Sequence, residues 1–336
     1  MPSALTEHFL HLQTQLPASG PGFSAVVLDH GAVTFELHHG LASLEWGVPL
    51  SAQSMYYMAS ESKQFLAAAI LRQVQAGAIG LDDDVCAHLP ELAGFEQPFA
   101  LRSLLNHSSG IPDYFQFLQC QPTRHAADYF SNREILAVIA RMDEVSVPTG
   151  SAHRYSNSNY ILLAALLERL TGMPVARHVR ETLLLPLGIT CTGFDDDRQN
   201  VLPQRVFSYE SDAARPFGVK QHLGNANTVG DGGLYACTEE LLLWEREWHR
   251  QWAQPDSVLR AMLQPSPLND GATPSYRFGL EWLQRDGHDI VFHGGSLWGF
   301  HTLLLRVPQR QLSVIMLSNS DRADPDWEQI AALALA

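Results

Sequence analysis

A serine and a lysine stand three residues apart at the start of a segment with helical periodicity. Apolar residues recur at close to the 3.6-residue helical period between Ser62 and Gln75, and Ser60 lies just before this segment. A serine at a helix start presents a backbone N–H that can bind an oxyanion. Lys63 lies one turn along the same face, where loss of hydration would let it accept the serine proton. The alternative is a capping serine and a solvated lysine, because Ser-x-x-Lys alone is weakly specific.

Lysine is rare in this chain, so each lysine is informative. Of the 22 basic residues, Lys63 and Lys220 are lysines and the other 20 are arginines. Arginine keeps its proton in proteins, whereas lysine can lose it. A lysine beside the candidate nucleophile therefore suggests a need for a removable proton.

A tyrosine and an asparagine, Tyr155 and Asn157, precede a second helical segment over 160–167 that stops at Gly172. In an extended segment, side chains two residues apart point to the same side, so those of Tyr155 and Asn157 would do so. A tyrosine can relay a proton, and an asparagine amide can hold both a lysine ammonium and a substrate carbonyl. The alternative is that Asn157 or Ser158 only caps the helix.

The sequence His293-Gly294-Gly295-Ser296 follows a predicted strand that ends at Phe292. Two glycines there would let a ligand approach the backbone closely. The backbone N–H of Ser296 could then join that of Ser60 as the second donor of an oxyanion hole. The alternative is a glycine turn with an incidental histidine.

These residues must be positioned by a sheet and by helices. Strands are expected over 24–28 and 32–37, and again over 289–293, 300–307 and 312–317, after an aromatic and aliphatic stretch at 276–283. Further helices are expected over 101–106, 133–141, 175–184 and 238–247, and a loop over 109–122. We expect an α+β fold: a five-stranded antiparallel sheet built from both termini and flanked by helices. In a single unit 1–336, an α/β lobe would comprise about 1–62 plus 225–336, and an inserted, mostly helical lobe about 63–224.

Composition narrows the possible partners. The 336 residues are 46% hydrophobic and 17% charged, which is typical of a compact folded protein. No apolar run approaches the ~18 residues of a membrane span. Met1 to Ala18 has no signal-peptide pattern, so a cytoplasmic protein is expected. A net charge of −14 disfavours nucleic acid.

The cysteines and the absence of other sequence motifs argue against disulfide bonds, a metal site and a cofactor. The four cysteines (Cys86, Cys120, Cys191 and Cys237) form no Cys-x-x-Cys pair, so free thiols are expected rather than disulfides. No pattern of metal ligands, no G-x-S-x-G elbow and no phosphate-binding loop is present, so no cofactor is expected. The oligomeric state stays open.

The order and spacing of the three motifs are more specific than any one of them. Ser-x-x-Lys, Tyr-x-Asn about a hundred residues later and His-x-Gly near the C-terminus resemble the serine β-lactamase and penicillin-binding protein superfamily. The chain is most similar to the branch with class C β-lactamases, D-alanyl-D-alanine carboxypeptidases and esterases (peptidase family S12). The stretches 57–65, 104–114 and 230–235 are also typical of that branch. The resemblance covers roughly residues 20–319 and implies the two-lobed fold.

The resemblance also implies a role for each side chain. Ser60 would be the acylated nucleophile and Lys63 its base partner. Tyr155 would pass a proton to the leaving group and later activate water, and Asn157 would orient Lys63 and the substrate amide. His293 would lend positive or hydrogen-bonding character near the oxyanion hole. Which of Lys63 and Tyr155 is the principal base stays open.

One departure bears on the substrate. Class C β-lactamases have Lys-Thr-Gly where this chain has His293-Gly294-Gly295, and that lysine and threonine help to bind the β-lactam carboxylate. Gly294 and Gly295 would border the substrate, and Tyr114, Phe115 and Trp298 could line an apolar pocket, although plain packing would explain them as well.

The expected function is an acyl-serine hydrolase acting on a small-molecule ester or amide, a D-amino acid peptide being one candidate. No nucleic-acid or membrane partner is expected. The alternatives are a class C-like β-lactamase and a catalytically silent scaffold protein that keeps the fold.

Overall fold

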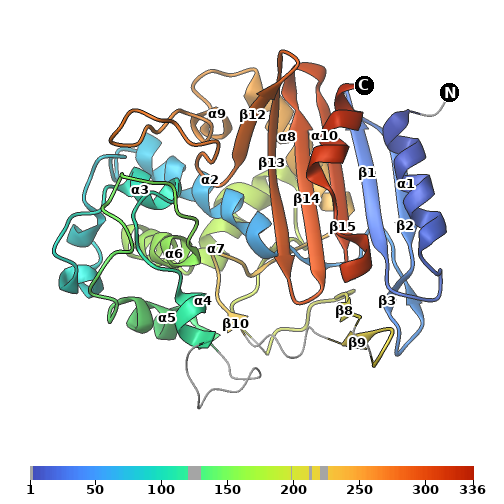
Figure 1. The fold of residues 1–336 in the computed structure, drawn as a ribbon, viewed down its shortest axis with the longest axis horizontal. Coiled ribbons are helices and arrows are strands. Elements are labelled where there is room, and N and C mark those ends of the chain that lie inside the picture. Colours follow the sequence, from blue (N-terminus) through green and yellow to red (C-terminus); the bar gives the residue numbers. More distant parts are fainter. Residues whose placement is uncertain (1–2, 120–129, 198, 212–213, 220–225) are drawn as a thin grey trace.

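The computed structural model describes residues 3–119, 130–197, 199–211, 214–219 and 226–336 (Figure 1). The helices in these ranges are α1 (Ala4–Gln15), α2 (Ser62–Gln75), α3 (Leu101–Leu105), α4 (Tyr114–Gln119), α5 (Asn132–Ile139), α6 (Asn157–Thr171), α7 (Val175–Val179), α8 (Thr238–Trp252), α9 (Val258–Ala261) and α10 (Trp327–Leu335). The main sheet comprises β1 (Phe23–Asp29), β2 (Ala32–His39), β12 (Glu281–Arg285), β13 (His288–Leu297), β14 (Phe300–Val307) and β15 (Leu312–Ser318). Short strands pair outside it: β3 (Leu41–Ser43) with β4 (Val48–Pro49), β5 (Tyr56–Tyr57) and β7 (Gly193–Phe194) with β11 (Leu234–Ala236), β6 (Phe130–Ser131) with β10 (Ala226–Asn227), and β8 (Tyr209–Glu210) with β9 (Gly218–Val219).

The main sheet joins the two ends of the chain, as predicted. Its order is β12-β13-β14-β15-β1-β2, and every neighbouring pair is antiparallel. The N-terminal β1 pairs with the C-terminal β15 from Phe23 opposite Ser318 to Asp29 opposite Leu312. The sheet has six strands where five were expected, because residues 281–285 form the edge strand β12 against β13.

Helices cover both faces of this sheet (Figure 1). On one face α1 and α10 pack on each other and on the sheet, and their apolar residues, including Phe9 and Ile330, join Phe292 and Leu305 in one buried cluster. On the other face α2 and α8 belong to a larger cluster that continues into α3, α5, α6 and α7. The site residues predicted from the sequence lie on this second side.

Most of the predicted helices are present. Helix α2 has the predicted bounds, and α6 ends where Gly172 takes a left-handed conformation, with φ of 67°. The expected loop 109–122 instead contains α4 in its described part, where Tyr114 is buried and Phe115 and Leu118 pack against the core. Residues 120–122 lie outside the described ranges, as does Lys220.

The cysteines that the structure describes carry free thiols. Cys86 is half-buried, Cys191 is exposed and Cys237 is buried, whereas Cys120 lies outside the described residues. None of the helices in the described ranges combines the length and the apolar composition that crossing a membrane requires.

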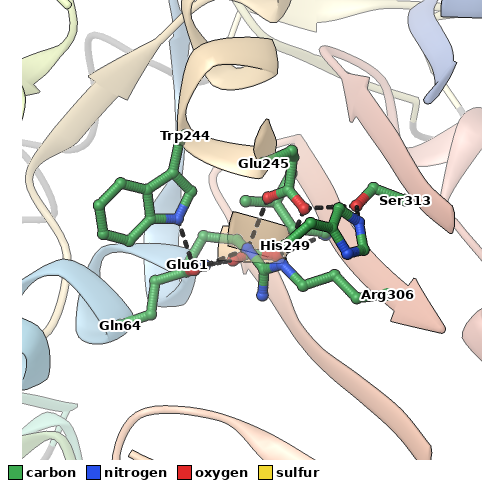
Figure 2. Close-up of polar contacts among 8 residues, drawn as sticks. Glu61, Gln64, Trp244, Glu245, His249, Arg306 and Ser313 are labelled. Atoms are coloured by element: carbon green, nitrogen blue, oxygen red, sulfur yellow. Dashed lines mark hydrogen bonds and ion pairs between the residues drawn. The ribbon is translucent and has the colours of Figure 1, made fainter. Parts of the chain in front are cut away.

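A buried ion pair ties α8 to β14 beneath α2 (Figure 2). The Arg306 guanidinium donates to both carboxylate oxygens of Glu245 at 2.8 and 2.6 Å, and both side chains are fully buried. Arg306 also donates to Gln64 Oε1 at 2.9 Å, and Gln64 donates to Glu61 Oε2 at 2.5 Å. Ser313 on β15 donates to Glu245 at 2.7 Å. These bonds connect the start of α2 with two strands and with α8.

Removing one partner of this pair is expected to destabilise the protein strongly. Glu245→Gln leaves the Arg306 charge buried without its counterion, at a cost of about 3–5 kcal/mol in the free energy of unfolding. The measurement is the free energy of unfolding from denaturant titration. As a control, Glu181→Gln breaks the exposed Arg177–Glu181 pair and should cost less than about 1 kcal/mol. Equal losses in the two variants would show that the buried pair has no special weight.

Candidate active site

Ser60 lies in a tight 3-10 turn, Ala59–Glu61, that leads directly into α2. The residue before it, Ala59, has φ of 48°, a left-handed conformation that costs a non-glycine residue roughly 1–3 kcal/mol. Neighbouring strands hold the turn. Met58 donates its N–H to Leu234 O at 2.8 Å, and Met58 O accepts from Thr302 Oγ1 at 3.1 Å. The strained backbone therefore presents Ser60 at a fixed place.

A second contact anchors the far side of this turn to β14. Glu61 Oε1 accepts the backbone N–H of Leu304 at 2.7 Å, and Glu61 is fully buried. Through Gln64, the same carboxyl is linked to the Arg306–Glu245 pair (Figure 2). The residue that follows Ser60 is thus bonded to the sheet.

The His-Gly-Gly-Ser segment belongs to strand β13 and does not follow it. The predicted strand end at Phe292 is wrong, because Gly294, Gly295 and Ser296 pair in register with Leu303, Thr302 and His301 of β14. A side chain at Gly295 would place its Cβ 2.3 Å from Met58 O and 2.4 Å from Thr302 Oγ1. Glycine is needed there because the strand passes directly against the turn that carries Ser60.

Lys63 is fully buried and faces the Ser60 hydroxyl. Its Nζ donates to Ser60 Oγ at 3.0 Å, to Asn157 Oδ1 at 2.8 Å and to Asp231 O at 2.7 Å. Burial lowers the pKa of Lys63 from 10.5 to about 8, although the carboxylates of Asp231 and Asp113 oppose that shift. A neutral fraction of Lys63 is therefore present near pH 7.

Tyr155 lies next to both Ser60 and Lys63. Tyr155 is 40% exposed, and its hydroxyl hydrogen bonds to Ser60. The Lys63 Nζ lies 5.0 Å from the centre of the ring. Burial raises the pKa of Tyr155 well above 10, so the phenol keeps its proton at neutral pH.

Asn157 is the first residue of α6. The sequence placed it before this helix, so the helix begins earlier than expected. Its backbone N–H and its Nδ2 both donate to Asp113 Oδ2, at 3.1 and 2.8 Å. These bonds orient the amide so that Oδ1 faces Lys63.

His293 is neutral. Burial and the nearby Lys63 lower the pKa of His293 to about 3. Its Nδ1–H donates to Gly294 O at 2.6 Å, so Nε2 is free to accept from Tyr276 Oη at 3.1 Å. Of the two properties expected of His293, the structure retains hydrogen bonding and not positive charge.

A cavity of about 220 Å³ opens over Ser60. It is lined by residues of β5, the turn, α4, α6, β13 and the glycine-rich loop that precedes β11: Tyr57, Ala59, Ser60, Phe115, Asn157, Thr228, Asp231, Gly232, Ser296 and Leu297. Ser60 and Ser296, the two expected oxyanion-hole residues, thus share one cavity.

The other expected binding residues surround this cavity without lining it. Gly294 is exposed on β13, and Gly295 is buried against the turn. Tyr114 is buried and donates its hydroxyl to Asp231 Oδ2 at 2.6 Å. Trp298 packs on Tyr57 with ring centres 5.6 Å apart.

Two carboxylates of the site, Asp113 and Asp231, were not singled out from the sequence. Each lies in a stretch typical of the S12 branch, and Asp231 stands among glycines at 230–233. For Asp231 the sequence does offer a signal, which is an acidic residue flanked by glycines. Glycines let other groups approach the backbone closely.

Comparisons with known proteins agree with this architecture. Among curated relatives, the D-aminopeptidase of Gluconobacter oxydans is 29% identical over 326 residues, covering 95% of this chain and 60% of that protein. The chain spans about three fifths of the length of the D-aminopeptidases it matches.

Solved structures share the fold. The octameric penicillin-binding protein homologue from Pyrococcus abyssi has a TM-score of 0.81 and 22% identity, covering 98% of this chain and 76% of that one. The D-amino acid amidase from Ochrobactrum anthropi SV3 has a TM-score of 0.79 and 19% identity, covering 99% and 97%. A family model described as Beta-lactamase matches residues 11–336. The chain therefore belongs to the Beta-lactamase family, within the serine β-lactamase and penicillin-binding protein superfamily.

Proposed function

We propose that this protein is an acyl-serine hydrolase that cleaves small esters or amides, D-amino acid amides and peptides among them, through an acyl-enzyme on Ser60. The observation that carries the proposal is the fully buried Lys63, whose Nζ lies 3.0 Å from Ser60 Oγ at the wall of a cavity. We also propose that residues 1–336 form one unit of two lobes, with the cavity bordered by α6 of the helical lobe and β13 of the α/β lobe.

Lys63 is the better candidate for the base. Its pKa of about 8 leaves a neutral fraction that can accept the Ser60 proton, whereas Tyr155, with its raised pKa, stays protonated. Once protonated, Lys63 is stabilised by the carboxylates of Asp231 and Asp113. Tyr155 then suits the role of relay.

The proposed steps balance in protons. Ser60 Oγ bonds to the substrate carbonyl carbon as its proton moves to Lys63, and the backbone N–H groups of Ser60 and Ser296 receive the oxyanion. As the intermediate collapses, Tyr155 gives its proton to the leaving group and regains one from Lys63. Water then attacks the acyl carbonyl as one of its protons moves to Lys63, and Ser60 Oγ takes up that proton when its bond to the acyl carbon breaks and the acid is released. Asn157 keeps Lys63 in line throughout.

Two features support esters or amides over β-lactams. The curated relatives include several named D-aminopeptidase. In addition, His293 is neutral and Gly294 has no side chain, so neither supplies the charged or hydroxyl contact that a β-lactam carboxylate would need.

The first test is covalent labelling with a fluorescent phosphonate. We expect one adduct, on Ser60, and a labelling rate that rises with pH through about 8, because Lys63 must lose its proton to act as base. At pH 6 the rate should be ~1% of its plateau, two units below that pKa. Mass spectrometry and a pH series of labelling rates give both readouts, and Ser60→Ala should remain unlabelled. An adduct on Ser62, Ser108 or Ser296, or a flat pH profile, would contradict the assignment.

The second test separates the proton of Lys63 from its charge. Lys63→Arg keeps the charge but cannot lose the proton, so we expect kcat to fall ~10²–10⁴-fold, almost as far as in Lys63→Ala. Arg72→Lys, on the exposed side of the same helix, should change kcat less than about twofold. If the arginine variant kept more than about half of the wild-type rate, Lys63 would act through charge alone.

The third test compares two substrates on one preparation. We expect kcat/KM for p-nitrophenyl butyrate to exceed that for nitrocefin by at least ~10–100-fold, the weight of one missing charge-assisted contact to the β-lactam carboxylate. We also expect a β-lactam acyl-enzyme to accumulate, visible as a mass shift, because the bound ring obstructs the deacylating water near Tyr155. A higher kcat/KM for nitrocefin would favour the β-lactamase alternative.

A further inference from the structure

One carboxylate at the candidate active site has no assigned task. Asp231 lies in the loop Gly230–Gly233 and is 5% exposed, yet it lines the cavity that contains Ser60. Its Oδ2 accepts the Tyr114 hydroxyl at 2.6 Å, and Thr228 supplies a further polar contact to the carboxyl group. Within the described part of the chain, Asp231 Oδ1 has no hydrogen-bond partner. A buried carboxylate oxygen without a donor is costly, so a ligand that brings a donor is favoured there.

The loop fixes this carboxylate beside the reacting groups. Asp231 O accepts from Lys63 Nζ at 2.7 Å, and Lys63 in turn reaches Ser60 Oγ at 3.0 Å. At Gly232 a Cβ would come within 2.4 Å of Tyr57 Oη, so the loop packs closely on the last residue of β5. Asp231 thus contacts, through its backbone carbonyl, the lysine that lies against the Ser60 hydroxyl.

The charges around the cavity favour a cation. Asp231 is the one acidic residue among the described residues that line the cavity. A second carboxylate, that of Asp113, accepts a hydrogen bond from the lining residue Asn157. When Lys63 is neutral, as the proposed base must be, two carboxylates remain. Burial keeps both His293 and His107 neutral by lowering their pKa values. No described Arg or Lys side chain lines this cavity.

We propose that Asp231 binds a protonated amino group on the acyl half of the substrate, next to the scissile carbonyl, so that the enzyme prefers acyl groups bearing an ammonium. This inference rests on the proposed function and gives its substrate class. An ammonium supplies the missing donor to Oδ1 and, while Lys63 is neutral, a counter-charge to the two carboxylates. An acyl group bearing a carboxylate would meet like charge at the same place.

The test uses two substrates that differ only in the amino group, D-alanine p-nitroanilide and propionyl p-nitroanilide. The measured quantity is the ratio of their kcat/KM values, corrected by the ratio of their hydroxide-catalysed rates to remove the inductive effect of the ammonium. Changes at Ser60 or Lys63 affect both substrates and cancel in this ratio. We expect a corrected wild-type ratio of at least ~10, and a ~10–100-fold fall in Asp231→Asn.

Two comparisons control for general damage. Asp231→Glu keeps the charge and should retain most of the preference. Asp289→Asn changes another buried carboxylate, one that accepts from Gln284 and Gln309, and should leave the ratio unchanged. In the wild type, the ratio should also fall as pH rises past about 8, where an α-amino group loses its proton.

A corrected wild-type ratio near one, or a ratio with no pH dependence, overturns the inference whether or not any variant folds. An unchanged ratio in Asp231→Asn overturns it as well. If p-nitrophenyl butyrate is turned over and Ser60 is labelled in the same preparation, that failure leaves the hydrolase proposal intact. If neither occurs, the hydrolase proposal itself has failed.

Discussion

The fastening of the Ser60 turn to strands β13 and β14 is the constraint on which the rest of the site depends. Ala59 holds a left-handed backbone that an alanine does not adopt unaided, so the surrounding contacts must make it the only fit. Glu61 bonds to Leu304, Thr302 bonds to Met58 O, and Gly295 leaves room for the strand to touch the turn. Behind them the Arg306–Glu245 pair locks β14 to α8 and, through Gln64, to α2. The hydroxyl of Ser60 is positioned by the core of the protein and not by a mobile loop.

The same burial sets the electrostatics. A lysine with no exposed surface loses the hydration that favours its charged form, which is why the pKa of Lys63 falls to about 8. Asp113 and Asp231 limit the fall, and they sit where a newly protonated Lys63 needs a counter-charge. Lys63 is thereby poised between its two protonation states near neutral pH. His293 is neutral and so adds no second positive charge beside Lys63. Its ring nitrogens hydrogen bond to Gly294 O and Tyr276 Oη.

Much of this could be predicted from the sequence, and the misses have physical causes. Helix periodicity gave α2, and motif spacing gave Ser60, Lys63, Tyr155 and Asn157, which the structure does bring together. The strand β13 was predicted to end before Gly294, because glycine is ordinarily a turn signal and the pairing with β14 that overrides it is not visible locally. The Arg306–Glu245 pair and the approach of Asp231 to Lys63 join residues far apart in the chain, and a single sequence carries no signal for such contacts.

The pairing of β1 with β15 has a consequence for folding during synthesis on the ribosome. Strand β1 is made before the helices that separate it in the chain from its neighbour in the sheet, β15. The strands that hold the Ser60 turn, β13 and β14, also arrive late, after the helices between them and α2 have had time to form. A nascent chain that stops before residue 295 has Ser60 and Lys63 but lacks the contacts from Gly295, Thr302 and Leu304 that hold the turn around Ala59. The geometry around Ser60 would therefore be complete only once β13 and β14 have been made, and fragments released before that point would lack it.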